Sequence, residues 1–78
     1  MERKQYVAVC YSKMDANLFE AAEEAQYFLR DVEGRRYEGE PVISARLVTM
    51  FPEFYPAGAV SRYAFIVVAE TAIPWEGS

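Results

Sequence analysis

The chain has 78 residues, 12 acidic and 8 basic side chains, a formal net charge of −4, one cysteine and no histidine. This length predicts a single domain, residues 1–78, whose core is so small that we expect oligomerisation to add stability. The composition argues against a disulfide framework, against nonspecific nucleic-acid binding and against histidine-dependent chemistry. We expect a cytoplasmic protein without a signal peptide or membrane segment, because no stretch approaches the ~20 apolar residues that span a bilayer.

Residues 5–12 alternate with a period of two, which predicts a first strand. Both sides of this strand are largely apolar: Val7, Val9 and Tyr11 point one way, and Tyr6, Ala8 and Cys10 the other. Such a strand is either central in its sheet or covered on its second side by another chain.

A helix follows, capped at its start by Ser12 or Asp15 and beginning near Asp15. Gly34 is well placed to end it. Its apolar residues recur at helical spacing and form one stripe: Leu18, Ala21, Ala22, Ala25, Phe28, Leu29 and Val32. The alanines allow close approach, so we expect the helix to pack flat on strands.

Residues 35–41 predict a turn, and residues 42–51 and 59–71 predict two further strands. Pro52 and Pro56 lie between them, so we expect residues 51–58 to form a projecting loop, either without regular structure or with the ends of the two strands extending into it. The apolar run of residues 63–69 is typical of a central strand. A right-handed crossover through the helix places the second strand parallel to the first, and the hairpin then lets the third strand run antiparallel between them. The predicted fold is α+β: a β-α-β-β two-layer domain with a three-stranded antiparallel or mixed sheet of order 1-3-2 and the helix on one face.

One helix leaves the other sheet face uncovered, and side-chain alternation places Leu47, Phe65 and Val67 beneath the helix. An apolar face of this size is seldom exposed on monomers, so we expect a second subunit to bury it. The candidate interface residues on this face, and in the loop that joins the strands, are Val48, Met50, Phe54, Tyr55, Ala64, Ile66 and Val68.

Arg46 and Arg62 are expected on the same face, diagonal to each other across a hairpin centred near Phe54 or Tyr55. Two guanidinium groups can bind a carboxylate or phosphate in bidentate fashion, or they can pair with Glu70 or a glutamate of another subunit. Tyr63 and Trp75 are further candidate ligand contacts. The aromatic residues of the 51–55 loop suit either a planar ligand or a protein interface.

The chain resembles the dodecins, small flavin-binding proteins that assemble into hollow dodecamers. The resemblance lies in the alanine-rich helix after a short first strand, in Gly58, Ala59 and Val60 opening the last strand, and in that strand's course through Tyr63, Phe65 and Val67. It implies the same fold and a homo-oligomer. Flavin-binding dodecins place a tryptophan and a glutamine where this chain has Ala45 and Ala64, so the resemblance leaves the cofactor unknown, with Trp75 as a substitute stacking residue.

No catalytic group is predicted. The paired glutamates lie on the solvent side of the helix or in a turn, Cys10 has no histidine base, and neither a phosphate-binding glycine loop nor metal-ligand spacing occurs. We therefore expect a non-enzymatic homo-oligomer that binds a small anionic or aromatic ligand. The alternative is a protein-interaction module, such as an inhibitor or adaptor, that uses the uncovered face or the 51–55 loop.

Overall fold

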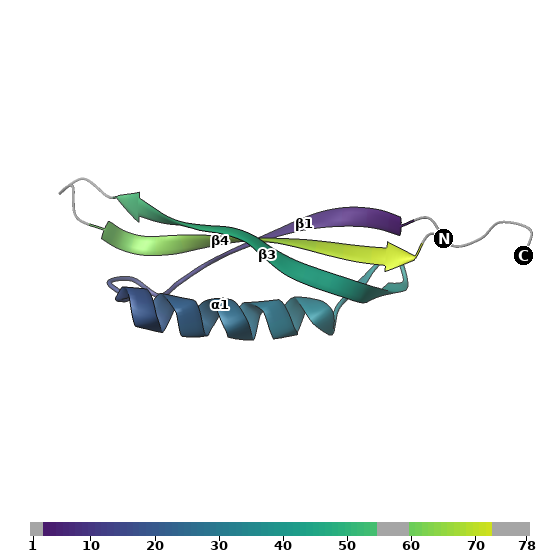
Figure 1. Ribbon diagram of the computed structural model, residues 1–78, viewed down its shortest axis with the longest axis horizontal. Helices are drawn as coiled ribbons and strands as arrows, with labels where there is room; N and C mark the ends of the chain where they lie inside the picture. Colours follow the sequence, from purple (N-terminus) through teal and green to yellow (C-terminus); the bar gives the residue numbers. More distant parts are fainter. Residues whose placement is uncertain (1–2, 55–59, 73–78) are drawn as a thin grey trace, which may run out of the picture.

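The computed structural model describes residues 3–54 and 60–72, which form a sheet with one helix along one of its faces (Figure 1). The elements in chain order are β1 Arg3–Tyr11, α1 Leu18–Glu33, β2 Arg36–Tyr37, β3 Glu40–Phe54 and β4 Val60–Ala72. The predicted α+β class and β-α-β-β order are confirmed.

The sheet formed by the described residues has four strands in the order β1-β4-β3-β2, so the predicted three-stranded sheet of order 1-3-2 is wrong. The additional strand is β2, in which Arg36 and Tyr37 pair with the start of β3. A tight turn permits this pairing, since Glu38 and Gly39 adopt positive φ values of 52° and 85°. The last strand lies between the first and the long strand, as its apolar run indicated.

β3 continues to Phe54, so the end of this strand extends into the 51–58 connection, which is one of the two arrangements that the sequence left open. Residues 55–59 lie outside the described residues. Pro52 is accommodated in this strand opposite Tyr63. The backbone groups of Tyr63 are bonded on the opposite side of β4, which faces Ser12. The Tyr63 C=O accepts from the Ser12 N–H at 2.8 Å, and the Tyr63 N–H donates to the Ser12 hydroxyl at 2.8 Å. Pro52 therefore lies at a position where β4 requires no donor from β3.

α1 begins at Leu18 rather than near Asp15, because Asn17 provides the cap. Its side chain accepts from the Glu20 N–H at 2.8 Å, and the Glu20 carboxylate accepts from the Asn17 N–H at 3.1 Å, which forms a capping box. The buried side of α1 is narrower than predicted: Leu18 and Ala22 are exposed. The core packs one helix side against the sheet and comprises Ala21, Ala25, Phe28, Val32, Ala8, Phe65, Val67 and Ala69.

The turn between β2 and β3 reaches across the helix side of the sheet to β1. Tyr37 stacks on Tyr6 with ring centroids 4.6 Å apart. The Glu38 carboxylate pairs with the Lys4 ammonium at 2.5 Å and accepts a hydrogen bond from the Tyr6 hydroxyl. These contacts fix the edge strand β2 and the edge strand β1 to each other, although β3 and β4 lie between them.

We predict that Glu38→Gln changes the pH dependence of unfolding. Lys4 and Tyr6 hold the pKa of Glu38 below 4.5, so its stabilising contribution is present above pH 4.5 and is lost as the pH falls through the lowered pKa. Glu38 raises the pKa of Tyr6 above 10.0, so that contribution is lost as the pH rises through the raised value. The free energies of unfolding of wild type and Glu38→Gln, measured in urea, should therefore converge at both extremes of pH. A constant difference would contradict the assignment.

Candidate functional site

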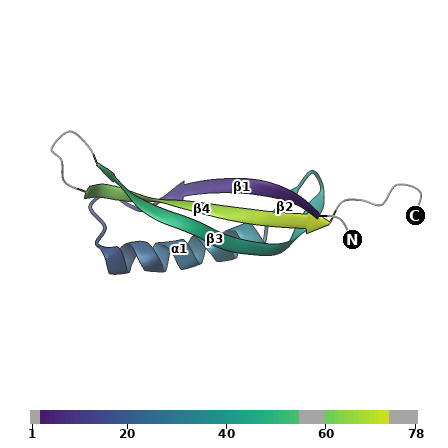
Figure 2. The same ribbon diagram turned by 45° about the horizontal axis from the view of Figure 1, so that its top comes forward.

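The sheet face opposite α1, here called the open face, is covered by no helix or strand of the described residues (Figure 2). The register places its side chains in rows that cross β1, β4 and β3. Three consecutive rows carry most of its apolar groups: Val7, Val68 and Arg46; Val9, Ile66 and Thr49; and Tyr11, Ala64 and Phe51. The apolar side chains of these three rows thus form a continuous strip across β1, β4 and β3, here called the apolar strip.

Several of these side chains are unusually exposed for large apolar groups. Val7 is 67 % exposed, Val9 49 % and Phe51 42 %. Ile66 and Val68 on the central strand are partly covered, and Ala64 is fully buried between the larger residues that flank it in its row. The predicted placement of Ala64, Ile66 and Val68 on this face is confirmed by the register.

Polar contacts close both ends of the apolar strip. At one end, Glu70 accepts a hydrogen bond from the Ser44 hydroxyl at 2.9 Å and lies 3.8 Å from the Arg3 guanidinium. At the other end, the Arg62 guanidinium donates to Glu53 at 2.6 Å. An apolar centre with a polar boundary is the usual composition of a protein interface.

Arg62 is held by two neighbours from two different strands. Besides its ion pair with Glu53 of β3, its guanidinium carbon lies 3.9 Å from the ring centroid of Tyr11 of β1. Both charged side chains are largely covered, at 28 % and 29 % exposed. Arg62 therefore ties the three strands together at this end of the sheet.

The predicted proximity of Arg46 and Arg62 is wrong. Arg46 pairs with Val68, six positions along β4 from Arg62, which is about 20 Å at the usual rise per residue. The register is centred beyond both Phe54 and Tyr55, because Glu53 is already opposite Arg62. Arg46 is exposed and makes no ion pair with the described residues, and Glu70 is bonded to Ser44 and Arg3 instead. One guanidinium, rather than two, remains as a candidate anion contact.

Two of the other predicted residues lie on the helix side of the sheet. A bulge at Val48, which is 48 % exposed, shifts the register between Leu47 and Thr49 and turns Met50 toward the core opposite Phe65. Tyr63 also packs against the core. Phe54 is 59 % exposed at the end of β3. Tyr55 and Trp75 lie outside the described residues.

The structure separates the two positions that the dodecin resemblance aligns with flavin contacts. Ala45 pairs with Ala69 on the helix side, whereas Ala64 pairs with Phe51 on the open face. The two positions therefore lie on opposite faces of one sheet, and neither side chain can stack on a ring or donate a hydrogen bond.

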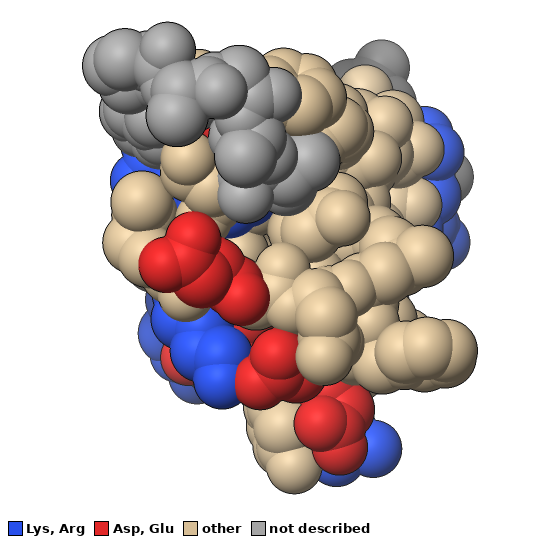
Figure 3. Space-filling view, turned by 90° about the vertical axis from the view of Figure 1, so that its left-hand side faces the viewer, with Lys and Arg blue, Asp and Glu red and all other residues tan. Residues whose placement is uncertain are grey.

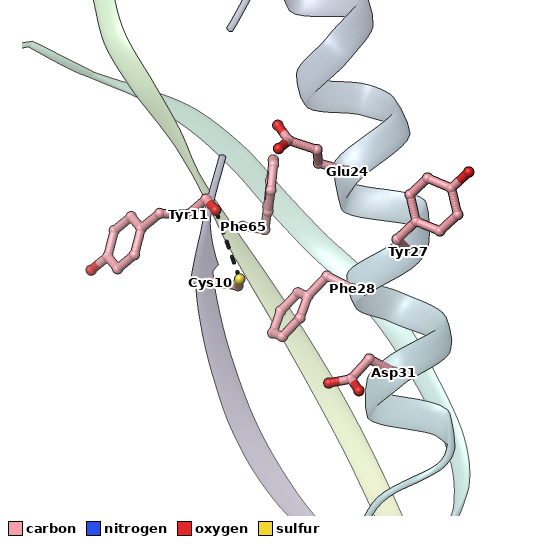
Figure 4. Close-up of a pocket in the computed structure, with 7 residues that line it drawn as sticks. All are labelled: Cys10, Tyr11, Glu24, Tyr27, Phe28, Asp31 and Phe65. Atoms are coloured by element: carbon pink, nitrogen blue, oxygen red, sulfur yellow. Dashed lines mark hydrogen bonds between the residues drawn. The ribbon is translucent and has the colours of Figure 1, made fainter. Parts of the chain in front are cut away.

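A groove that the sequence did not indicate lies between α1 and β1, on the helix side of the sheet. α1 packs over β3 and β4, so a groove of about 330 Å³ remains beside β1. Figure 4 shows Cys10, Phe28 and Phe65 directed into this groove, while the rings of Tyr11 and Tyr27 point away from it. Its two carboxylates are engaged: Asp31 pairs with Arg35 at 2.6 Å, and Glu24 accepts from the Lys13 N–H at 3.3 Å.

Charge is unevenly distributed at the end of the molecule where α1 begins. Figure 3 shows acidic side chains beside basic ones in the lower part of the view, where α1 lies, and a broad uncharged area next to them.

Within the described residues, no group of acidic or cysteine side chains is arranged to hold a metal ion, and no helix is long and apolar enough to cross a membrane.

Comparison with protein-family models, with curated proteins and with solved structures gave no significant match.

We predict that Arg62→Met lowers the free energy of unfolding by about 1 kcal/mol, because it removes a largely covered ion pair and a cation–π contact. The matched control is Arg46→Met, which removes an exposed guanidinium and should change the free energy by less than about 0.5 kcal/mol. Urea unfolding followed by circular dichroism measures both. Equal losses in the two variants would show that the Tyr11 and Glu53 contacts contribute nothing.

Proposed function

We propose that this protein is a non-enzymatic, dodecin-like binding protein whose subunits associate through the open face. The observation that carries the proposal is the apolar strip of Val7, Val9, Ile66, Val68 and Phe51, which the described residues leave without cover. Contiguous apolar patches of more than a few hundred Å² are rare on soluble monomers and mark interaction surfaces.

Association of like subunits fits the small size of the domain and the charges around the apolar strip. A domain of 78 residues buries a small core, and burial of a second apolar layer adds the stability that such domains usually lack. The polar contacts of Glu70 and Arg62 at the two ends of the strip satisfy their own charges within one chain. Arg46 is then the charged side chain of the three rows that has no ion pair with the described residues, and it needs a partner when two copies meet.

The proposed cargo is a small anionic or aromatic molecule enclosed between subunits. Arg46 supports the anionic choice, because its guanidinium is exposed beside Val68 and makes no ion pair with the described residues. Guanidinium groups at the margin of an apolar surface bind carboxylate or phosphate with two parallel hydrogen bonds.

We predict that Ile66→Arg disrupts the contact through the open face and lowers the mass of the oligomer. Ile66 is central in the strip and lies on β4, which is paired on both sides, so the new charge acts on the face and not on a sheet edge. Light scattering and native mass spectrometry should report a fall in mass at micromolar concentration.

Phe19→Arg is the matched control, since Phe19 is 85 % exposed on α1 and lies on the other side of the sheet. It should leave the mass unchanged. A wild-type protein that has the mass of one chain would overturn the homo-oligomer and favour an interaction module with a different partner.

We predict that any anionic molecule retained by the native protein is lost in Arg46→Met. Native mass spectrometry of protein isolated from its own host reports stoichiometry and retained ligand together. The Arg46→Lys variant keeps the positive charge but cannot form two parallel hydrogen bonds, so this variant should retain the ligand only in part. Retention unchanged in Arg46→Met would exclude this residue from the binding site.

A further inference from the structure

We infer that β1 pairs along its free edge with β1 of a second copy, forming a continuous sheet across two subunits. This contact uses a different surface from the open face and does not depend on the proposed function. It rests on the direction of the free backbone groups of β1, on the absence of blocking features along this edge, and on the charges at its ends.

The direction of the backbone groups follows from the contacts of Ser12. The Ser12 N–H donates to the Tyr63 carbonyl at 2.8 Å, so this position is bonded toward β4. The β1–β4 register continues from it without a shift, and antiparallel bonding alternates along the strand. Tyr6, Ala8 and Cys10 therefore bond toward β4, whereas the N–H and C=O groups of Gln5, Val7, Val9 and Tyr11 point away from it. Within the described residues, β1 has no strand on that outer side.

The two long edges of the sheet differ in how they are protected. Exposed edges usually carry prolines, bulges or charged residues that prevent pairing with another chain. β3 has all of these devices: Pro41 and Pro52 lie within it, and its register with β4 is irregular at three places. In β1, by contrast, residues 5–11 contain no proline, no charged residue and no register shift. One edge is blocked and the other is competent to pair.

The charges around this segment favour a second copy of the same chain as the occupant. The basic residues at its two ends are already neutralised, because Arg3 pairs with Glu70, Lys4 with Glu38 and Lys13 with Glu20. Two uncharged β1 segments can therefore lie side by side in antiparallel orientation without bringing unpaired like charges together. The β2–β3 turn contacts Lys4 and Tyr6, so the pairing centres on the residues from Val7 to Tyr11.

The pairing has a defined geometry. Antiparallel pairing of two identical edges has a two-fold axis perpendicular to the sheet, so both helices lie on the same side. α1 packs over β3 and β4 and leaves the approach to β1 open (Figure 2). The two α1–β1 grooves then face each other across the axis, and on the other side Val7 and Val9 of both copies join the two apolar strips into one.

Amide hydrogen exchange tests this directly by NMR, because adjacent residues of β1 respond differently. In an unpaired edge, the amides of Val7, Val9 and Tyr11 exchange rapidly, and only those of Tyr6, Ala8 and Cys10 are slow. Edge pairing should slow the outward set by about a hundredfold as well. Rapid exchange of the outward amides at the highest soluble concentration would overturn the inference. So would their protection in a preparation that has the mass of one chain, since the cover would then come from the chain itself.

Val9→Pro is the corresponding variant, since it removes an outward N–H and leaves the bonds to β4 in place. It should return the Val7 and Tyr11 amides to rapid exchange and lower the mass of the assembly, while the Ala8 and Cys10 amides stay protected. Val9→Thr is the control that keeps the N–H and the branched side chain, and in it the Val7 and Tyr11 amides should stay slow. If Val9→Pro fails to fold, the exchange pattern of the wild type decides alone.

The same measurement separates this contact from the open-face contact. Ile66→Arg should reduce the mass through the open face while the Val7, Val9 and Tyr11 amides remain slow. If Ile66→Arg leaves the mass unchanged and the outward amides are slow, the open-face proposal fails and the edge pairing stands. If Ile66→Arg reduces the mass and the outward amides are fast, the reverse holds.

Discussion

The antiparallel ladders on the two sides of β4 are the contacts on which the rest of the domain depends. Their register decides which side chains face α1 and which form the open face. It also places Tyr63 with both of its backbone groups on Ser12, so that β3 can include Pro52. The cross-strand contacts of Arg62 and Glu70 lie at fixed positions along these ladders, and they bound the apolar strip at its two ends.

The lateral position of α1 has consequences for both proposed contacts. The helix is narrower on its buried side than its sequence indicates, and it packs over β3 and β4. Among residues 3–54 and 60–72, β1 is therefore covered on one face only in part, and no strand or helix lies on its other face or along its outer edge. One strand can thus contact other copies of the chain in two ways: through its side chains on the open face and through its backbone along the outer edge. Val7 and Val9 take part in both contacts.

Much of the fold was predictable because alternation and helical spacing are local properties. The strand-helix-strand-strand order follows from them, and so does the placement of Ala64, Ile66 and Val68 on the uncovered face. The site was predicted less well. A single unpaired residue, Val48, reverses the direction of Met50, and a hairpin centred past Phe54 separates Arg46 from Arg62. Bulges and turn positions depend on which residues of the two paired strands meet, and no local pattern specifies that.

The sequence by itself determined the class of fold, the central position of the last strand and the presence of an apolar face without a helix. These follow from how many apolar residues each segment has and how they repeat. Only the tertiary structure decided the register, the engagement of Arg62 by Tyr11 and Glu53, the groove beside β1 and the difference between the two sheet edges. The physical reason is that each of these features depends on how separate strands, or a strand and the helix, are aligned in the folded sheet, which no single segment specifies.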